Sequence, residues 1–147
     1  MKRHHVTRSV LLPYAIDDIF GLVANVEGYR EFLPWCRESR VIDKNDNELV
    51  ASIQVVVAGH SEKMVTRNIL EPHTRIGLEL VKGPFSSFAG EWRFSDLRIG
   101  CKATLDLSFE FHGWLLRLVG PRAIEIAIDR VLTAFTDQAR KSLKSCE

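Results

Sequence analysis

The sequence contains VEGYREFLPWC at residues 26–36 and LVKGPFSSFAGEWRF at residues 80–94, and both segments place aromatic residues beside glycine and proline. Glycine and proline fix the path of the backbone, so the large rings on such a path face either the protein core or a bound ligand. The choice between these two roles bears directly on the function of the protein.

Around these segments, apolar and polar residues alternate from Glu38 onward, and turn residues recur about every ten positions. In the last alternating stretch, 101–111, large apolar residues occupy one face and polar residues such as Asp106 occupy the other. This pattern predicts an antiparallel meander of about six strands with one dry and one wet face. The expected strands lie around Val41 and at 49–57, 64–70, 76–81, 88–94 and 101–111.

Before the meander, the pattern predicts a short strand at 6–12 that ends at Pro13, a helix from Ile16, and a second short helix at 29–33 that stops before Pro34. Asp17 and Asp18 stand in the first helical turn, where the helix dipole favours carboxylates. A catalytic dyad is the alternative for this pair, although adjacent residues point apart on a helix.

The chain closes with a long predicted helix that begins at Gly120-Pro121 and runs to about Leu143. Its apolar residues fall on one arc at helical spacing: Ile124, Ile128, Val131, Leu132, Phe135, Ala139 and Leu143. The apolar face of this helix and the apolar face of the sheet must both be buried, so we expect them to pack against each other, and long sheets coil. We therefore expect a single α+β domain over residues 1–147, in which a curved antiparallel sheet wraps the helix and leaves room for a cavity. The preceding GWLLRLV, residues 113–119, is either a mobile lid or the first turns of a kinked helix.

Composition narrows the classes of function. The formal net charge is +1, from 20 basic and 19 acidic residues, so nucleic acid or membrane would be met only through a local patch. Three cysteines without CxxC spacing indicate neither a disulfide framework nor a zinc site, which favours a reducing cytoplasm. No signal peptide or transmembrane segment is expected.

Catalytic and metal chemistry find little support. His60-Ser61-Glu62 has the H-x-E form of a zinc deaminase but lacks the cysteine partner, and the five histidines show no ligand spacing, so no metal site is expected. Ser86 and Ser87 lack the G-x-S-x-G frame of a nucleophile, and no phosphate-binding loop occurs. We expect no catalytic residue and no required cofactor.

Two surfaces are candidates for binding. Lys82 is a candidate cation at the mouth of the cavity, with solvation as the ordinary alternative, and the aromatic residues either line the cavity or belong to the core. The candidate ligand-binding residues are Tyr29, Phe32, Leu33, Trp35, Lys82, Phe85, Phe88, Trp92, Leu116, Ile124, Ile128, Leu132 and Phe135. The second surface is basic, and it is either a solvated helix face or a contact for an anionic partner such as RNA or lipid head groups. Its residues are Arg122, Arg130, Arg140, Lys141 and Lys144.

At YREFLPWC, at KGPF with GEWRF, and at LSFEF before the terminal helix, the sequence resembles the polyketide-cyclase and coenzyme-Q-binding branch of the START-like (SRPBCC) helix-grip superfamily. The resemblance spans nearly the whole chain. It implies a sheet of about six or seven strands around the long helix, with two short helices after the first strand. The family signature falls on Tyr29, Phe32, Leu33, Pro34 and Trp35, and on Lys82, Gly83, Pro84, Phe85, Trp92 and Phe94. Relatives commonly carry a bulky aliphatic residue after KGPF, where this chain has Ser86, Ser87 and Phe88.

The resemblance implies one of three functions. The first is non-enzymatic binding of ubiquinone or a related isoprenoid lipid under the long helix, in support of respiration, in the cytoplasm or peripheral to the inner membrane. The second is the role of the RatA-type ribosome-association toxins, which bind the large ribosomal subunit and block its joining to the small one. The third is a cyclase-like enzyme, for which the resemblance supplies no catalytic residue in this chain.

Overall fold

The computed structural model describes residues 3–57 and 59–146, without the side chains of residues 57, 115, 116 and 118. Helices and strands are grouped along the chain. A strand and two short helices come first, six strands follow in succession, and two helices end the chain. In chain order they are β1 (His4–Leu12), α1 (Ile16–Ala24), the 3-10 helix η1 (Val26–Glu31), β2 (Cys36–Lys44), β3 (Glu48–Val57), β4 (His60–Glu71), β5 (Arg75–Lys82), β6 (Phe85–Asp96), β7 (Cys101–Phe111), α2 (Gly113–Leu118) and α3 (Pro121–Ser142).

The strands form one antiparallel sheet of seven strands in the order β1-β7-β6-β5-β4-β3-β2. The six-strand meander is therefore confirmed, and β1 joins it by pairing with β7 along its whole length. Register shifts interrupt the pairing of β2 with β3, of β4 with β5, and of β6 with β7 near Phe85. Such bulges increase the local twist and bend a strand, which curves the sheet into a trough.

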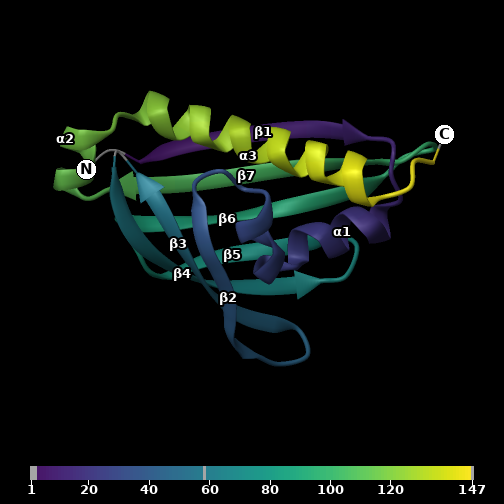
Figure 1. Ribbon diagram of the computed structural model, residues 1–147, viewed down its shortest axis with the longest axis horizontal. Helices are drawn as coiled ribbons and strands as arrows, with labels where there is room; N and C mark the ends of the chain where they lie inside the picture. Colours follow the sequence, from purple (N-terminus) through teal and green to yellow (C-terminus); the bar gives the residue numbers. More distant parts are fainter. Residues whose placement is uncertain (1–2, 58, 147) are drawn as a thin grey trace.

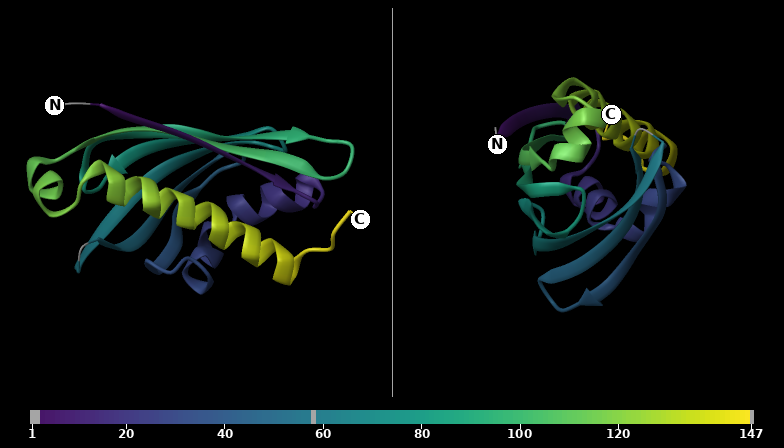
Figure 2. Two further views of the ribbon diagram at one scale, coloured as in Figure 1. Left: turned by 90° about the horizontal axis from the view of Figure 1, so that it is seen from above. Right: turned by 90° about the vertical axis from the view of Figure 1, so that its left-hand side faces the viewer.

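The long helix α3 lies along the open side of this trough (Figure 1). Seen end-on, the sheet curls around an interior that α3 closes on one side (Figure 2). The helix buries Ile128, Leu132, Phe135 and Ala139, which confirms the predicted apolar arc. The C-terminal end of α3 is held in place by the segment that follows it, where the Cys146 backbone N–H donates to the Pro13 carbonyl at 2.8 Å. The expected α+β helix-grip architecture is thus present.

The short helices close one end of the trough. Helix α1 buries Ile19, Phe20 and Val23, and the Phe20 ring meets Phe94 of β6 edge-on at 5.5 Å. Asp17 and Asp18 lie in its first turn, as the helix interpretation required. The second predicted helix, 29–33, begins earlier and ends earlier, as η1. Segment 113–119 forms a separate short helix, α2, because Gly120 adopts an extended conformation between it and α3.

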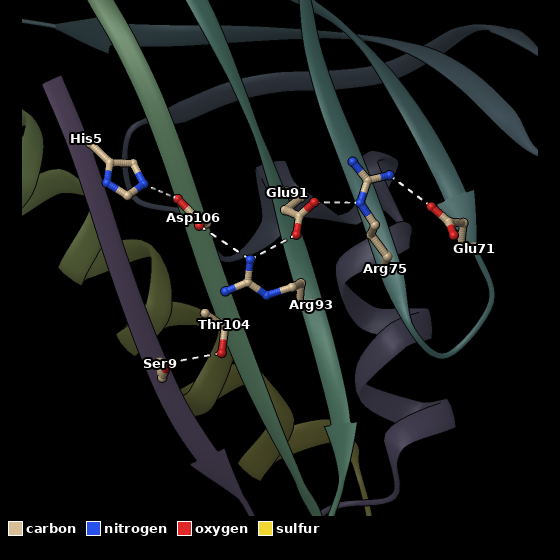
Figure 3. A network of polar contacts seen from close by, with 8 residues as sticks. All are labelled: His5, Ser9, Glu71, Arg75, Glu91, Arg93, Thr104 and Asp106. Carbon is tan, nitrogen blue, oxygen red and sulfur yellow. Dashed lines mark hydrogen bonds and ion pairs between the residues drawn. The ribbon is translucent and has the colours of Figure 1, made fainter. Parts of the chain in front are cut away.

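The outer face of the sheet carries a chain of alternating charges across β1, β7, β6, β5 and β4 (Figure 3). His5 contacts Asp106 at 2.5 Å, and Arg93 joins Asp106 to Glu91 at 3.4 and 3.0 Å. Arg75 then contacts Glu91 at 2.6 Å and Glu71 at 2.9 Å. These pairs confirm that the polar residues of β7 and β6 face away from the core.

Candidate ligand cavity

A cavity of about 450 Å³ lies between the concave face of the sheet and α3. This volume falls in the range of small-molecule sites, roughly 300–1,000 Å³. Its walls come from η1 and the following loop, from β3 to β7, and from α3 between Ala123 and Phe135. The lining is largely aliphatic and aromatic, and includes Val26, Ala51, Ile53, Val55, Met64, Leu78, Leu105, Leu107 and Phe109 besides the predicted residues described below.

The aromatic wall is centred on Phe135 of α3. Tyr29, Phe32 and Trp92 each meet its ring in an edge-on arrangement, at centroid distances of 5.4, 5.2 and 5.5 Å. Edge-on pairs at these distances are favourable beyond the apolar area that they bury. Residues from η1, β6 and α3 are thereby held together, so the rings from the two aromatic sequence segments meet at one place.

The segment at residues 26–36 is held over the sheet by buried Ser39 of β2. The Ser39 hydroxyl donates to the Glu27 carbonyl at 3.2 Å and accepts from the Arg30 backbone N–H at 3.1 Å. The Tyr29 hydroxyl donates to the Val23 carbonyl, and burial raises the pKa of this phenol well above its ordinary value. Tyr29 therefore stays neutral, and its proton is engaged within the protein.

The first residues of β6, just after the turn from β5, supply the other aromatic group. Pro84 is buried against the cavity, and the Phe85 ring lies 5.4 Å from Phe88 and 5.7 Å from Phe109. Phe85 belongs to β6 rather than to the turn, because the register shift between Phe85 and Ser87 lets the strand begin earlier.

The mouth of the cavity lies along α3. The exposed members of the lining are Ala123, Ile126 and Arg130, all on one flank of this helix, and Ile126 is 40% exposed. The opposite flank faces β1, where Arg8 contacts Glu125 at 3.2 Å and Asp129 at 2.8 Å. The helix is thus pinned on one side and borders the opening on the other.

Two polar residues stand inside this apolar enclosure, and the sequence reasoning missed both. Thr66 and Asn68 follow Met64 at alternate positions of β4, and all three line the cavity. Asn68 is only 4% exposed, and the Thr66 hydroxyl donates to its side-chain carbonyl oxygen at 2.8 Å. The sequence signal was available: two polar residues occupy the inward phase of a strand whose neighbours on that face are apolar.

Most of the predicted ligand-binding residues do meet at the cavity. Those that line it are Tyr29, Leu33, Trp35, Phe85, Phe88, Trp92, Ile124, Ile128 and Phe135. Phe32 and Leu132 pack in the adjacent core and do not contribute to the lining. The side chain of Leu116 lies outside the described residues.

Lys82 differs from the expectation of a cation at the mouth. It ends β5 with its side chain exposed, outside the lining. A register shift at Val81 interrupts the alternation of β5, so Lys82 does not continue the inward phase of Leu78. Arg130 takes this place instead, as the one cation among the described lining residues.

The predicted basic face is exposed on α3 and just beyond it. Arg122, Arg130, Arg140, Lys141 and Lys144 are all exposed, and only Arg140 among them pairs with a described acid, Asp137, at 3.1 Å. Asp129 and Glu125, the other acids on this part of the helix, are engaged by Arg8. This leaves a surface of cations available to an anionic partner.

Across the described ranges, no group of three or more histidines, cysteines and acids is arranged to hold a metal ion. The described part of the cavity lining contains no histidine, acid or cysteine, so it offers no general acid or base of those types. None of the described helices is long and apolar enough to cross a membrane.

Comparisons with known proteins agree with this architecture. The family model for polyketide cyclase / dehydrase and lipid transport matches residues 12–136. The ribosome association toxin RatA of Pseudomonas aeruginosa is 37% identical over 139 residues, which cover 93% of this chain and 96% of that protein. The mitochondrial coenzyme Q-binding protein COQ10 homolog B of Xenopus laevis is 26% identical over 94% of this chain and 59% of its own length.

Solved structures give the same fold. The Zhui aromatase/cyclase from Streptomyces superposes with a TM-score of 0.84 over 95% of each chain, at 20% identity. That likeness establishes the fold and leaves the chemistry open, because the cavity of this chain must be judged on its own residues. By the match over residues 12–136 and the similarity to RatA over nearly its whole length, the chain belongs to the polyketide cyclase / dehydrase and lipid transport family.

Proposed function

We propose that this protein is a non-enzymatic binder of an apolar ligand, an isoprenoid quinone or a related isoprenoid lipid, in the cavity under α3. The observation that carries the proposal is the cavity of about 450 Å³ with its largely aliphatic and aromatic lining and its opening beside Ile126. Burial contributes about 0.8 kcal/mol per methylene, so an isoprenoid tail gains affinity here without many polar contacts.

The absence of acid and base chemistry in the described lining supports binding rather than catalysis. Tyr29, the lining phenol, is neutral and donates its proton to a backbone carbonyl. A cyclase mechanism would need a group placed to take up or deliver a proton at the substrate. We therefore propose no catalytic step for this chain.

Tryptophan fluorescence tests the proposal. Trp35 and Trp92 line the cavity, so a quinone bound there should quench their emission. We expect decylubiquinone to quench wild type saturably, and Ile128→Asp and Ala127→Trp to abolish or strongly weaken the effect, because the first places a charge in the wall and the second fills the space beside the mouth.

Thr133→Trp is the matched control. Thr133 is exposed on the same helix and does not line the cavity, so quenching should persist in this variant. Linear, unsaturable quenching of wild type, or equal saturable quenching in all folded variants, would refute cavity binding.

A second candidate function is association with the ribosome. The observation that favours it is the set of relatives named ribosome association toxin RatA, which reach 37% identity over 93% of this chain. The exposed cations of α3 and its C-terminal extension supply a surface suited to phosphate backbones. We infer that the large ribosomal subunit is the contact on this reading.

Sedimentation with ribosomes at low salt tests the second candidate. Arg140→Glu with Lys144→Glu should release the protein from the subunit fraction, whereas Arg40→Glu with Lys44→Glu, the same charge change on exposed residues of β2, should not. Both sites lie outside the cavity lining, so quinone binding is unaffected in either variant. Co-sedimentation that survives the α3 changes would remove this face as the contact.

A further inference from the structure

The cavity wall carries one nearly buried side-chain amide. Asn68 is 4% exposed and lines the cavity. Its side-chain oxygen accepts from the Thr66 hydroxyl at 2.8 Å, so its amide nitrogen is the donor that this side chain can present to the cavity. A donor in an apolar wall is favourable only when it meets an acceptor, so it calls for an occupant that carries one.

Alternation along β4 points these two residues inward on the same face as Met64, and the pairing of β4 with β3 is regular there. On the other side a register shift separates the pairs Val65–Lys82 and Thr66–Leu80, so Val81 of β5 is the extra residue of a bulge beside Thr66. Bulges bend the strand that carries them and often stand next to functional sites. Asn68 sits in the middle of the sheet, paired with Leu49 of β3 and Leu78 of β5.

The polar pair is away from the mouth. The exposed lining residues, Ala123, Ile126 and Arg130, all belong to the first half of α3. Asn68 is instead paired with Leu49, which clusters with Val26 and Ala51 beneath η1. An entering ligand therefore reaches Asn68 with its leading end.

The hydrogen-bond donors and charges of the cavity wall determine which chemical group the leading end of the ligand can carry. The Thr66 hydroxyl donates to Asn68 and the Tyr29 hydroxyl donates to the Val23 carbonyl, so neither is available to a ligand, whereas the Asn68 amide is. Trp35, another lining residue, has a buried indole nitrogen with no partner among the described residues. The charged member of the described lining is Arg130 at the mouth, so a carboxylate or phosphate at the deep end would be unpaired.

We propose that Asn68, held in orientation by Thr66, donates a hydrogen bond to an uncharged carbonyl or ether oxygen at the buried end of the ligand, while the apolar tail leaves along α3. This inference rests on the proposed binding of an apolar ligand in the cavity. It narrows the ligand class to molecules with a neutral oxygen-bearing head, and it assigns Asn68 and Thr66 as the residues that select for that head.

Competition between two probes of similar length tests the assignment. Decylubiquinone carries carbonyl and ether oxygens on its ring, and decylbenzene carries none. We expect Asn68→Leu, which keeps the side-chain size but removes the donor, to weaken decylubiquinone binding about three- to tenfold while decylbenzene binds as well as before or better. Thr66→Val, which frees the amide to rotate, should shift the ratio of the two affinities in the same direction by less.

The outcomes distinguish binding of an apolar ligand in the cavity from selection of its head group by Asn68. If wild type binds neither probe, the proposed function fails and this inference fails with it. If both probes bind wild type and their affinity ratio is unchanged in Asn68→Leu and in Thr66→Val, the cavity binds apolar ligands but the polar pair does not select the head. Thermal unfolding of both variants, compared with wild type, confirms that the ratio is measured on folded protein.

Discussion

At the residue scale, the three cysteines illustrate how burial sets reactivity. Cys101 is 0% exposed, and burial raises the pKa of its thiol to about 11. Burial also raises the pKa of Cys36, whereas Cys146 is exposed near the chain end. The thiolate is the reactive form of cysteine. Burial therefore slows the reaction of Cys36 and Cys101 with a reagent in two ways, because it blocks access to the sulfur and keeps the thiol protonated.

We therefore expect a disulfide reagent at pH 8 to label one thiol rapidly in native protein and all three after unfolding. Cys146→Ser should abolish the rapid phase and leave the unfolded count one lower. Rapid labelling of more than one thiol in native wild type would show that β2 or β7 is more open than described.

At the element scale, β6 depends on Gly90, which lies opposite Leu107 of β7 and Leu78 of β5. A Cβ built on Gly90 would stand 2.1 Å from the Asp106 carbonyl oxygen and 2.7 Å from the Leu107 side chain. Both neighbours are in the same sheet, so neither can move without breaking the pairing that curves the sheet around the cavity.

Gly90→Ala should lower the free energy of unfolding by at least the roughly 1–3 kcal/mol usual for overpacking, because the Asp106 carbonyl at 2.1 Å is backbone and would have to move by about an ångström. Gly21→Ala is the matched control. Gly21 lies within α1 with open space around it, so alanine should stabilise the protein by about 0.5–1 kcal/mol. Denaturant unfolding measures both, and equal effects would contradict the proposed close approach of β6 and β7.

The elements were largely predictable because their patterns are regular. Alternation over 101–111 and the arc from Ile124 to Leu143 follow from periods of two and of helical spacing, and both were confirmed. Single positions were harder. Lys82 was placed at the mouth because it precedes Gly83-Pro84-Phe85, yet a bulge in β5 just before it interrupts the inward phase, and Arg130 lies at the mouth instead.

Asn68 and Thr66 differ from Lys82, because alternation along β4 already places them on the same face as Met64. Their direction could therefore be predicted from the sequence. The hydrogen bond from the Thr66 hydroxyl to the Asn68 oxygen depends on side-chain conformation, so it appears only in the structure.

At the scale of the whole molecule, the outer face couples five strands through charge (Figure 3). The hydrogen bond from Arg75, aided by Arg93, holds the pKa of Glu91 below its ordinary value of 4.5. Because this pKa is lower in the folded protein than in the unfolded chain, the stabilisation is present above about pH 4.5 and is lost as the pH falls through the folded value.

Glu91→Gln should thus lower stability at pH 7 and lower it less at pH 3. The effect should stay below about 1 kcal/mol, since the network is partly exposed and screened. Glu31→Gln, at an exposed acid with no described partner, is the control and should leave both values nearly unchanged. A Glu91→Gln effect that is equal at both pH values would mean that the side chain stabilises by packing rather than by charge.

The two candidate functions use opposite sides of one helix. The buried arc of α3 roofs the cavity, and its exposed cations face solvent, with Arg130 shared at the border. Ligand occupancy and ribosome association are therefore separable by mutation, since Arg140 and Lys144 lie outside the lining and Ile128 lies within it.

The central claim is that the cavity holds an apolar molecule. Its most direct test is organic extraction and mass spectrometry of the protein purified gently from a quinone-producing bacterium, with Ala127→Trp purified in parallel. We predict a stoichiometric quinone or isoprenoid lipid with wild type and its loss from the variant. Folded wild-type protein that carries no such molecule, and acquires none when incubated with quinone, would contradict the account.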